Sequence, residues 1–559
     1  MRPRHRSYRN GGGGGSGLVV ASSVAYGVGG VALAAAAVGA VVAYATLTHT
    51  PRRRVGVSRE QWVAAVAESG AVTGFDTLVH EIAQRGVEPE LRSEAWPFLL
   101  GVFSPESTYE ERRRQHALMV QQHQQLLLQC QGLEAALRDC VRGRDAAAAA
   151  GAGAEPGGGE GGAAAAGGGG GGGPPHELPA QVVQFAEAHR IIVIDAVRTD
   201  FRRASVAAIY SSAAADGGGG DDEGDGGGGG GGGRGGACTL FGAAPLADPT
   251  VLSWVSGWLG SHPGGVWGGG RRLWVSEAAQ TVLDGSGHLG PEGRRQAARL
   301  VALLSAYAVF DPETGYCQGM SDLAMPLLVL LDDDALAFWC FAALMRTFGA
   351  RANFAVDEAG MFSQLRGLGV ALGRADRVLA HKLRVMGAGD CHFAYRMAVV
   401  LMRRDLPLGQ AMTLWELLWA DARRQLLQRR QRGAGARGVP PGLAPAGSVT
   451  ASLDGGDGGG GGSDGDPKAA LKRAQAAKEA ARVAAAEGED AGFLAAAFSE
   501  LFVHFLASVA VGARRRVLDE CAGPDDAMRL FHSLKSIDFW ECVSRAHVLR
   551  AAGASRKHR

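Results

Sequence analysis

A short stretch near the middle of the chain carries side chains that could act on a reacting group. Residues 311–320 have the sequence DPETGYCQGM, in which the proline and the first glycine predict a turn. Tyr316 and Gln318 then place a ring and a carboxamide at alternate positions beside Gly319, where the backbone can bend or approach a partner closely. A carboxamide both donates and accepts hydrogen bonds. Taken alone, the stretch is better explained as a helix–helix connection whose glutamine caps a backbone group.

A second stretch, IIVIDAVRT at residues 191–199, changes that interpretation. On a helix, Ile192, Asp195 and Arg198 fall at i, i+3 and i+6, close enough to one face for Asp195 to hold the Arg198 guanidinium. The alternative role for Arg198 is an ordinary ion pair on a helix surface, worth roughly a few tenths of a kcal/mol. That alternative would be preferred for the stretch alone, but not when Tyr316-x-Gln318-Gly319 follows downstream.

The pattern I-x-x-D-x-x-R followed by Y-x-Q-G resembles the paired motifs of the TBC domain, a family of GTPase-activating proteins for Rab GTPases. Two further blocks agree with it. Residues 86–101 look like the opening R-x-x-x-W-x-x-L-L-G segment of the family, and residues 391–396 with 414–421 look like its later helices. The four blocks occur in the family's order and extend from about Ser58 to Asp421, in a style similar to plant-type members.

The resemblance implies that Arg198 and Gln318 are catalytic groups supplied in trans to a Rab-type GTPase in its GTP-bound form. Asp195, Tyr316 and Gly319 would orient or support them. An inserted arginine offsets charge on the phosphate oxygens, typically with a gain of about 10³–10⁵-fold, and the glutamine would replace the GTPase's own in orienting water. The chain would then be an enzyme regulator in vesicle trafficking and would need no cofactor or metal of its own, because GTP and Mg²⁺ belong to the partner.

One local feature departs from the family pattern, and a second function remains open. The family usually places a proline shortly after the arginine, whereas Thr199-Asp200-Phe201 follows here. The alternative function is a catalytically silent module that holds a GTP-loaded Rab at a membrane. The presence of both catalytic residue types favours activity.

Other classes of protein find little support in the sequence. No G-x-x-x-x-G-K-[ST] motif occurs, and the G-x-S-x-G string at residues 461–465 lies in a Gly-rich segment with no strand before it. The eight cysteines form no C-x-x-C pair and are expected to be reduced, and Asp332–Asp334 is expected to be a solvated acidic turn. A formal net charge of +1 gives no electrostatic drive toward nucleic acid.

The apolar residues recur at helical spacing, without sustained strand alternation, and predict an all-α fold. The resemblance implies that this fold is a multi-helix TBC domain. The 86 glycines, about twice the ordinary frequency, gather in runs that predict disordered Gly/Ala-rich inserts. Residues 237–299 give no clear helices. We therefore expect the domain over 58–432 with inserts at 146–175 and 213–236, a disordered linker at 433–466, C-terminal helices over 467–550 that pack on the domain, and a tail at 551–559.

The N-terminal residues 1–57 are basic and Gly-rich, and residues 18–47 carry no charge. This uncharged segment exceeds the roughly 20 residues that span a bilayer, and arginines follow it, so it could be a single transmembrane helix. An organellar transit peptide and a low-complexity tail are the other two interpretations. With an anchor, the domain would lie on the cytoplasmic face of an intracellular membrane; without one it would be cytosolic.

Overall fold

The structure, a computed structural model, describes residues 56–152, 179–199, 201, 240, 275–355, 360–437, 467–534 and 536–557. Within these ranges the chain is helical, and its only β contacts are isolated bridges at Val57–Val87 and Val66–Val72. The all-α class predicted from the sequence is confirmed. The segment 1–55, with the apolar stretch 18–47, lies outside the described residues, as do the insert 213–236 and most of the inserts at 146–175 and 433–466.

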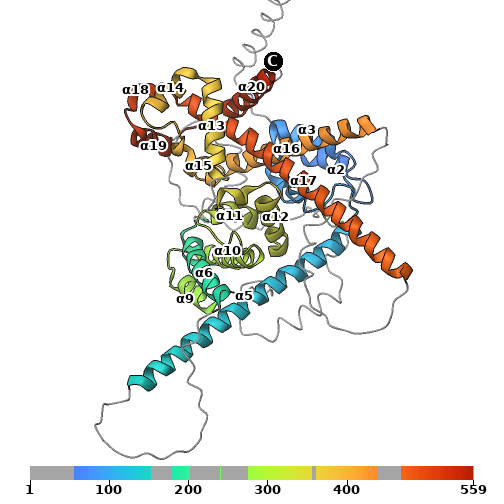
Figure 1. Cartoon of the computed structure of the whole chain (residues 1–559), viewed down its shortest axis with the longest axis vertical. Helices are drawn as coiled ribbons and strands as arrows, with labels where there is room; N and C mark the ends of the chain where they lie inside the picture. The colour runs from blue at the N-terminus through green and yellow to red at the C-terminus, as the bar shows by residue number, and fades with distance from the viewer. Residues whose placement is uncertain are drawn as a thin grey trace, which may run out of the picture. The chain divides into compact units, whose positions relative to one another are not determined.

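The helices differ widely in length, and Figure 1 labels them along the chain. In chain order they are α2 (Arg59–Ala65), α3 (Phe75–Arg85), α4 (Arg92–Leu100), α5 (Tyr109–Ala152), α6 (Ala180–Arg198), α9 (Glu277–Gly285), α10 (Pro291–Phe310), α11 (Met320–Leu330), α12 (Asp334–Arg346), α13 (Met361–Ala375), α14 (Arg377–Val385), α15 (Tyr395–Val399), α16 (Leu408–Arg437), α17 (Pro467–Gly512), α18 (Arg514–Glu520), α19 (Pro524–His532) and α20 (Phe539–Lys557).

A buried carboxylate ties the opening block of the sequence to α16. Glu416 accepts hydrogen bonds from Arg92 Nε at 2.7 Å, from Trp96 Nε1 at 3.0 Å and from the Val87 backbone N–H at 3.0 Å. Burial raises the pKa of Glu416, while the positive charge of Arg92 acts in the opposite direction. The R-x-x-x-W spacing therefore has a structural purpose, since the arginine and the tryptophan lie one helical turn apart and reach the same carboxylate.

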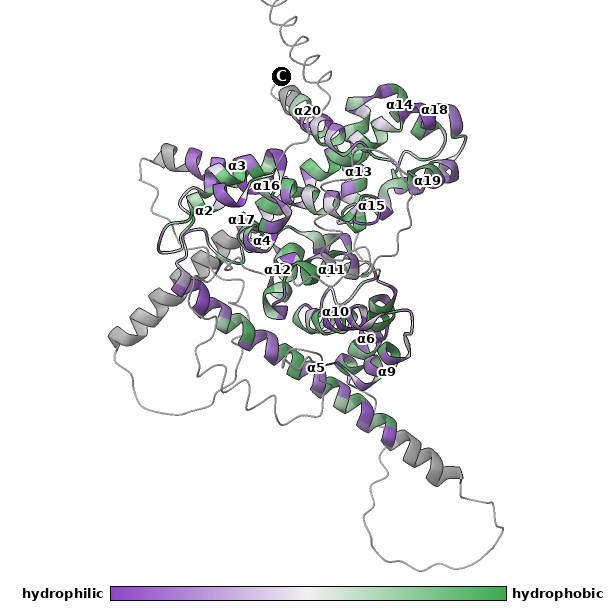
Figure 2. Cartoon of the chain, turned by 180° about the vertical axis from the view of Figure 1, so that it is seen from behind, coloured by the Kyte–Doolittle hydropathy of each residue, from purple (hydrophilic) through white to green (hydrophobic). Residues whose placement is uncertain are grey.

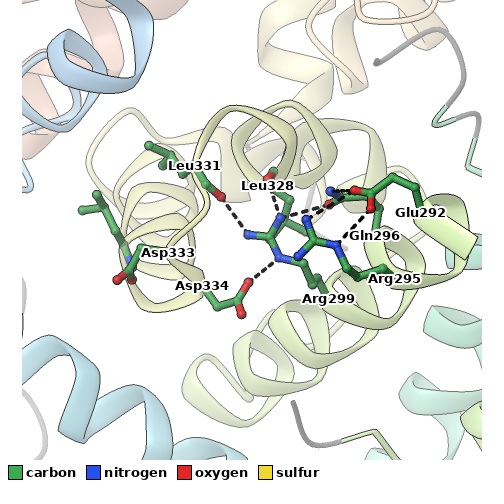
Figure 3. A network of polar contacts seen from close by, with 9 residues as sticks. Glu292, Arg295, Gln296, Arg299, Leu328, Leu331, Asp333 and Asp334 are labelled. Atoms are coloured by element: carbon green, nitrogen blue, oxygen red, sulfur yellow. Dashed lines mark hydrogen bonds and ion pairs between the residues drawn. The ribbon is translucent and has the colours of Figure 1, made fainter. Parts of the chain in front are cut away.

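The middle of the bundle is formed by α10, α11 and α12, whose ribbons carry green stretches of hydrophobic residues in Figure 2. Most residues of α11 and α12 are buried. A buried arginine joins the three helices, as Figure 3 shows. Arg299 on α10 donates to the carbonyl oxygens of Leu328 and Leu331 at the end of α11, at 2.8 and 2.7 Å, and to Asp334 Oδ1 on α12 at 2.6 Å.

This network corrects the interpretation of Asp332–Asp334 as a merely solvated turn. Asp333 caps α12 by accepting a 2.8 Å hydrogen bond from the Leu336 backbone N–H, and its other oxygen lies 3.0 Å from His116 Nε2 on α5. Because Asp334 is also paired with Arg299, two of the three acids fix the start of a helix. The last carbonyl groups of α11, which have no partner within their own helix, are satisfied by the same arginine.

The long helix α17, the first of the four C-terminal helices described, lies against α13, α16 and α20 (Figure 1). Phe498 packs on Phe348 with ring centroids 5.8 Å apart, and Asp421 of α16 accepts hydrogen bonds from Arg550 of α20. Among the described helices only the part of α17 at Gly488–Gly512 is long and apolar enough to cross a membrane, and 67% of that stretch is buried inside the protein. Its apolar character is therefore explained by its position in the core.

Several helix boundaries differ from those expected. α5 continues to Ala152 and α16 to Arg437, so both enter the predicted inserts, where alanine and arginine favour helix. α9 and the start of α10 lie within 237–299, where no clear helices were predicted. Each helix start there is marked by a single residue: Ser276 caps α9, and a proline is the first residue of α10.

Candidate functional site

Helix α6 carries Arg198 as its last residue and is locked in place by a buried histidine. His189 Nδ1 lies 2.9 Å from Ser305 Oγ on α10, and His189 Nε2 lies 2.6 Å from Ser276 Oγ at the start of α9. Burial lowers the pKa of His189 to about 4, so the ring is neutral at pH 7 and can donate through one nitrogen and accept through the other. α6 is thus held to two neighbouring helices, while the Arg198 side chain is exposed.

The loop 311–319 is shaped at its beginning by Asp311. The side chain of Asp311 accepts hydrogen bonds from Tyr307 Oη at 3.0 Å and from Thr314 Oγ1 at 3.2 Å, and its carbonyl oxygen accepts one from Gly315 N–H at 2.8 Å. The sequence predicted a turn here, and these contacts form it.

At the other end of the loop, Gly319 has a φ of 103° and begins α11. A Cβ at this position would lie 3.2 Å from Val400 Cγ1 and 3.6 Å from Phe354 Cε1. Both the left-handed backbone and the close neighbours require glycine. The preceding residue, Gln318, is exposed.

One hydrogen bond brings the two predicted stretches together. Tyr316 Oη donates to Asp195 Oδ2 at 2.7 Å, across 121 residues of sequence, and both side chains are buried. Burial and the neighbouring Asp195 carboxylate raise the pKa of Tyr316, which therefore stays protonated and able to donate. A second contact, from Gln184 Nε2 on α6 to the Pro312 carbonyl oxygen at 3.0 Å, holds the other side of the loop to the same helix.

The spacing on the helix predicted that Asp195 pairs with Arg198. The structure does not contain this pair. No hydrogen bond or ion pair between these two side chains is present, because the carboxylate of Asp195 is turned inward to Tyr316. The helix ends with Thr199 Oγ1 donating to the Asp195 carbonyl oxygen at 2.8 Å. The Arg198 guanidinium is exposed and forms no ion pair with another described residue.

Sequence reasoning missed a third segment at this site, the turn at residues 400–405. Arg404 Nη2 lies 2.6 Å from Asp322 Oδ2 in the first turn of α11, four residues after Gln318. The backbone before Arg404 is unusual, since Leu401 and Met402 have positive φ angles of 49° and 63°. No sequence pattern marks this turn, because its residues are not of the types that favour a left-handed backbone.

The arrangement places an exposed guanidinium and an exposed carboxamide on segments that are fixed to each other by buried contacts. α6, α10 and α11 lie side by side (Figure 1). Within the described part of the chain, no group of three His, Cys, Asp or Glu side chains could hold a metal ion. Such a surface can offer a positive charge and a hydrogen-bonding amide to a group brought by another molecule.

Comparisons with known proteins define the class. The family model described as the Rab-GTPase-TBC domain matches residues 291–428, which include Gln318 and Arg404. Rab GTPase-activating protein 22 of Arabidopsis thaliana is 32% identical over 401 residues, covering 66% of this chain and 67% of that protein. Human TBC1 domain family member 25 is 35% identical over 134 residues, covering 24% of this chain and 19% of that protein.

One further relative and one solved structure are also similar. GTPase-activating protein GYP7 of Yarrowia lipolytica is 37% identical over 119 residues, covering 21% of this chain and 16% of that protein. The crystal structure of the Ypt/Rab-GAP domain of Gyp1p matches 88% of this chain and 97% of its own, with a TM-score of 0.41 and 11% identity. That TM-score is too low to support a conclusion about this chain.

The chain belongs to the TBC family of Rab GTPase-activating proteins. It is accordingly a GTPase activator, an enzyme regulator whose partner is a Rab GTPase.

Proposed function

We propose that Arg198 and Gln318 are the groups that this protein inserts into the nucleotide site of a GTP-bound Rab. GTP hydrolysis is limited by charge that builds up on the phosphate oxygens and by poor orientation of the attacking water. The guanidinium addresses the first barrier and the carboxamide the second, because an amide can donate to a phosphate oxygen and accept from water. GTP and Mg²⁺ come with the Rab, and the protein contributes side chains only.

The observation that carries the proposal is the hydrogen bond between Tyr316 and Asp195. Asp195 lies one helical turn before Arg198, about 4.5 Å along the axis, and Tyr316 lies two residues before Gln318. A single buried contact therefore fixes the spacing of the two exposed groups. Such preorganisation is effective because the groups need little reordering when the Rab binds.

The test is single-turnover GTP hydrolysis by a panel of Rabs, with and without the full-length protein. We expect Arg198→Ala and Gln318→Ala each to lower stimulated hydrolysis by about 100-fold or more, equivalent to roughly 3 kcal/mol in the barrier. Arg198→Lys should be nearly as defective, since lysine lacks the planar fork. Arg190→Ala is the matched control, because Arg190 is an exposed arginine on the same helix, two turns earlier.

Two outcomes would contradict the proposal. If both alanine variants accelerate GTP loss as the parent does, the assignment of the two residues is wrong. If the unmutated protein binds GTP-loaded Rabs and stimulates none of them, the silent binding module is the better description.

We also propose that the protein acts in vesicle trafficking. Its site would face the cytosol, where it can meet a membrane-bound Rab. An anchored activator would share a surface with its membrane-bound Rab and gain effective concentration. We expect the full-length protein to sediment with membranes and resist carbonate extraction, and a chain lacking residues 1–51 to be soluble. A soluble full-length protein would argue against an anchor at 18–47.

A further inference from the structure

The turn that follows α15 contacts the segment around Gln318 at two points. Val400 lies next to Gly319, since its Cγ1 would be only 3.2 Å from a Cβ added at that glycine. Arg404 lies on the other side, with Nε at 3.0 Å and Nη2 at 2.6 Å from the same oxygen, Asp322 Oδ2. Because Gly319 and Asp322 bracket the first turn of α11, these two contacts fix the start of the helix that Gln318 precedes.

This turn is held in a backbone conformation that it would not adopt alone. Leu401 and Met402 both lie in the left-handed region and are completely buried. Trp415 Nε1 donates to the Leu401 carbonyl oxygen at 2.9 Å, and the Met402 N–H donates to the Met397 carbonyl oxygen at 2.8 Å. Strained residues of this kind persist only where the surrounding structure determines them, and they concentrate at functional sites. The strain here serves to present Arg404.

The electrostatic environment of Arg404 includes the Asp195 carboxylate on α6. The hydrogen bond with Asp322 raises the pKa of Arg404, and the negative charges of Asp322 and Asp195 act in the same direction. Arg404 is therefore influenced by the carboxylates of both segments that carry the proposed catalytic groups. Its positive charge offsets part of the negative charge of these two carboxylates at a surface that must receive the anionic phosphates of GTP.

We propose that Arg404 is a positioning residue for GTPase activation. It holds the beginning of α11, and with it Gln318, in register with α6, and it offsets the two carboxylates that would repel the phosphates. It acts through Asp322 and touches no reacting atom. The proposal rests on the proposed roles of Arg198 and Gln318.

The contact between Arg404 and Asp322 predicts that lysine can replace Arg404 but not Arg198. Both nitrogens of Arg404 reach a single carboxylate oxygen, so the planar fork is not used, and an ammonium group can replace it. Arg404→Lys should therefore retain stimulated hydrolysis to within about threefold, whereas Arg198→Lys should lose it.

The experiment measures single-turnover hydrolysis by a responsive Rab over a range of activator concentrations. We expect Arg404→Ala to lower the maximal rate by about tenfold or more, with a smaller change in the half-saturating concentration. Asp322→Asn should have a similar effect, and the double variant should be no worse than the more defective single one, because both remove one interaction. Arg430→Ala is the control, since its ion pair with Asp490 has similar exposure and joins α16 to α17 away from this turn.

A second measurement does not depend on activity. Hydrogen–deuterium exchange of residues 316–323 should be faster in Arg404→Ala than in the parent and in Arg430→Ala, while the thermal unfolding midpoint of the two variants stays similar. Unchanged exchange of residues 316–323 would overturn the proposal for Arg404. Failure of the proposed function would appear differently, as the absence of any Rab that responds to the unmutated protein, and the exchange measurement does not depend on it.

Two kinetic outcomes would also overturn it and leave the proposed function standing. In the first, Arg404→Ala is as active as Arg430→Ala while Arg198→Ala is inactive. In the second, Arg404→Lys is as defective as Arg404→Ala, which would indicate a direct contact between the guanidinium fork and the partner.

Discussion

The phenol of Tyr316 donates a 2.7 Å hydrogen bond to the carboxylate of Asp195, and neither side chain is more than 8% exposed. The bond joins the last turn of α6 to the loop that leads into α11. Since Arg198 and Gln318 extend outward from these two segments, the buried pair lies beneath the exposed pair. This arrangement separates the residues that set the geometry from those proposed to act on the nucleotide.

Replacing Tyr316 by phenylalanine tests this relationship. The change keeps the ring and removes the donor, leaving a buried carboxylate oxygen without its partner, at a cost of about 1–3 kcal/mol in the free energy of unfolding. Stimulated GTP hydrolysis should fall as well, but by less than in Arg198→Ala, because both catalytic groups remain. Tyr395→Phe is the control: Tyr395 is 45% exposed, and its variant should keep the parent's denaturation midpoint and hydrolysis rate.

Gly319→Ala should disturb the position of Gln318 directly. At a φ of 103° an alanine is strained, and its Cβ would press on Val400, so we expect a loss of about 1–2 kcal/mol in stability. The stimulated rate should fall about tenfold or more. Gly373→Ala, in the last turn of α13 with nothing within 4 Å of an added Cβ, should be neutral or stabilising. Equal behaviour of the two variants in denaturation and hydrolysis assays would contradict this account of Gly319.

Glu416→Gln should be among the most destabilising single changes away from the site. It leaves the guanidinium of Arg92 buried without a compensating charge, and breaking a buried pair in this way costs about 3–5 kcal/mol. The double variant Arg92→Met with Glu416→Met should recover part of the loss, because no unpaired charge remains. Chemical denaturation of the parent and the two variants checks this, and a double variant less stable than Glu416→Gln would refute it.

The pair formed by Asp421 and Arg550 predicts an acid-dependent contribution to stability. Burial by itself would raise the pKa of Asp421, but hydrogen bonds and charge from Arg550 and Arg424 outweigh it and lower the pKa to about 2 from a model-compound value of 3.8. Because the folded pKa is depressed, the stabilisation is complete above about pH 4 and is lost as the pH falls through 2. It amounts to about 2 kcal/mol.

Arg550→Ala should therefore be less stable than the parent at pH 7, by part of that amount because Arg424 still pairs with Asp421, and its stability should fall less steeply between pH 4 and 2. Arg430→Ala serves as the comparison, since that exposed ion pair should contribute about 1 kcal/mol or less. Urea denaturation at several pH values measures both. A parallel fall of parent and Arg550→Ala with acid would exclude Asp421 as the source.

Local sequence was sufficient to predict the helical class and the start of several elements. The spacing of Ser58 and Gln61 predicts a capping box, and the structure contains it, because both partners lie within three residues and need no distant contact. The residue types of Arg198 and Gln318 likewise indicated what each could do chemically. These inferences hold because spacing along a helix fixes which neighbours share a face.

Only the tertiary structure decided which partner each charged group took. The spacing on α6 predicted a pair between Asp195 and Arg198. Packing of the helix on α10 instead turns the Asp195 carboxylate inward to Tyr316, 121 residues away. Arg404 reaches Asp322 across 82 residues from a turn whose strained backbone has no local signal. A periodic pattern indicates which side of a helix is buried, but not which residues that side contacts. The free energy of these buried contacts arises only when distant segments pack together.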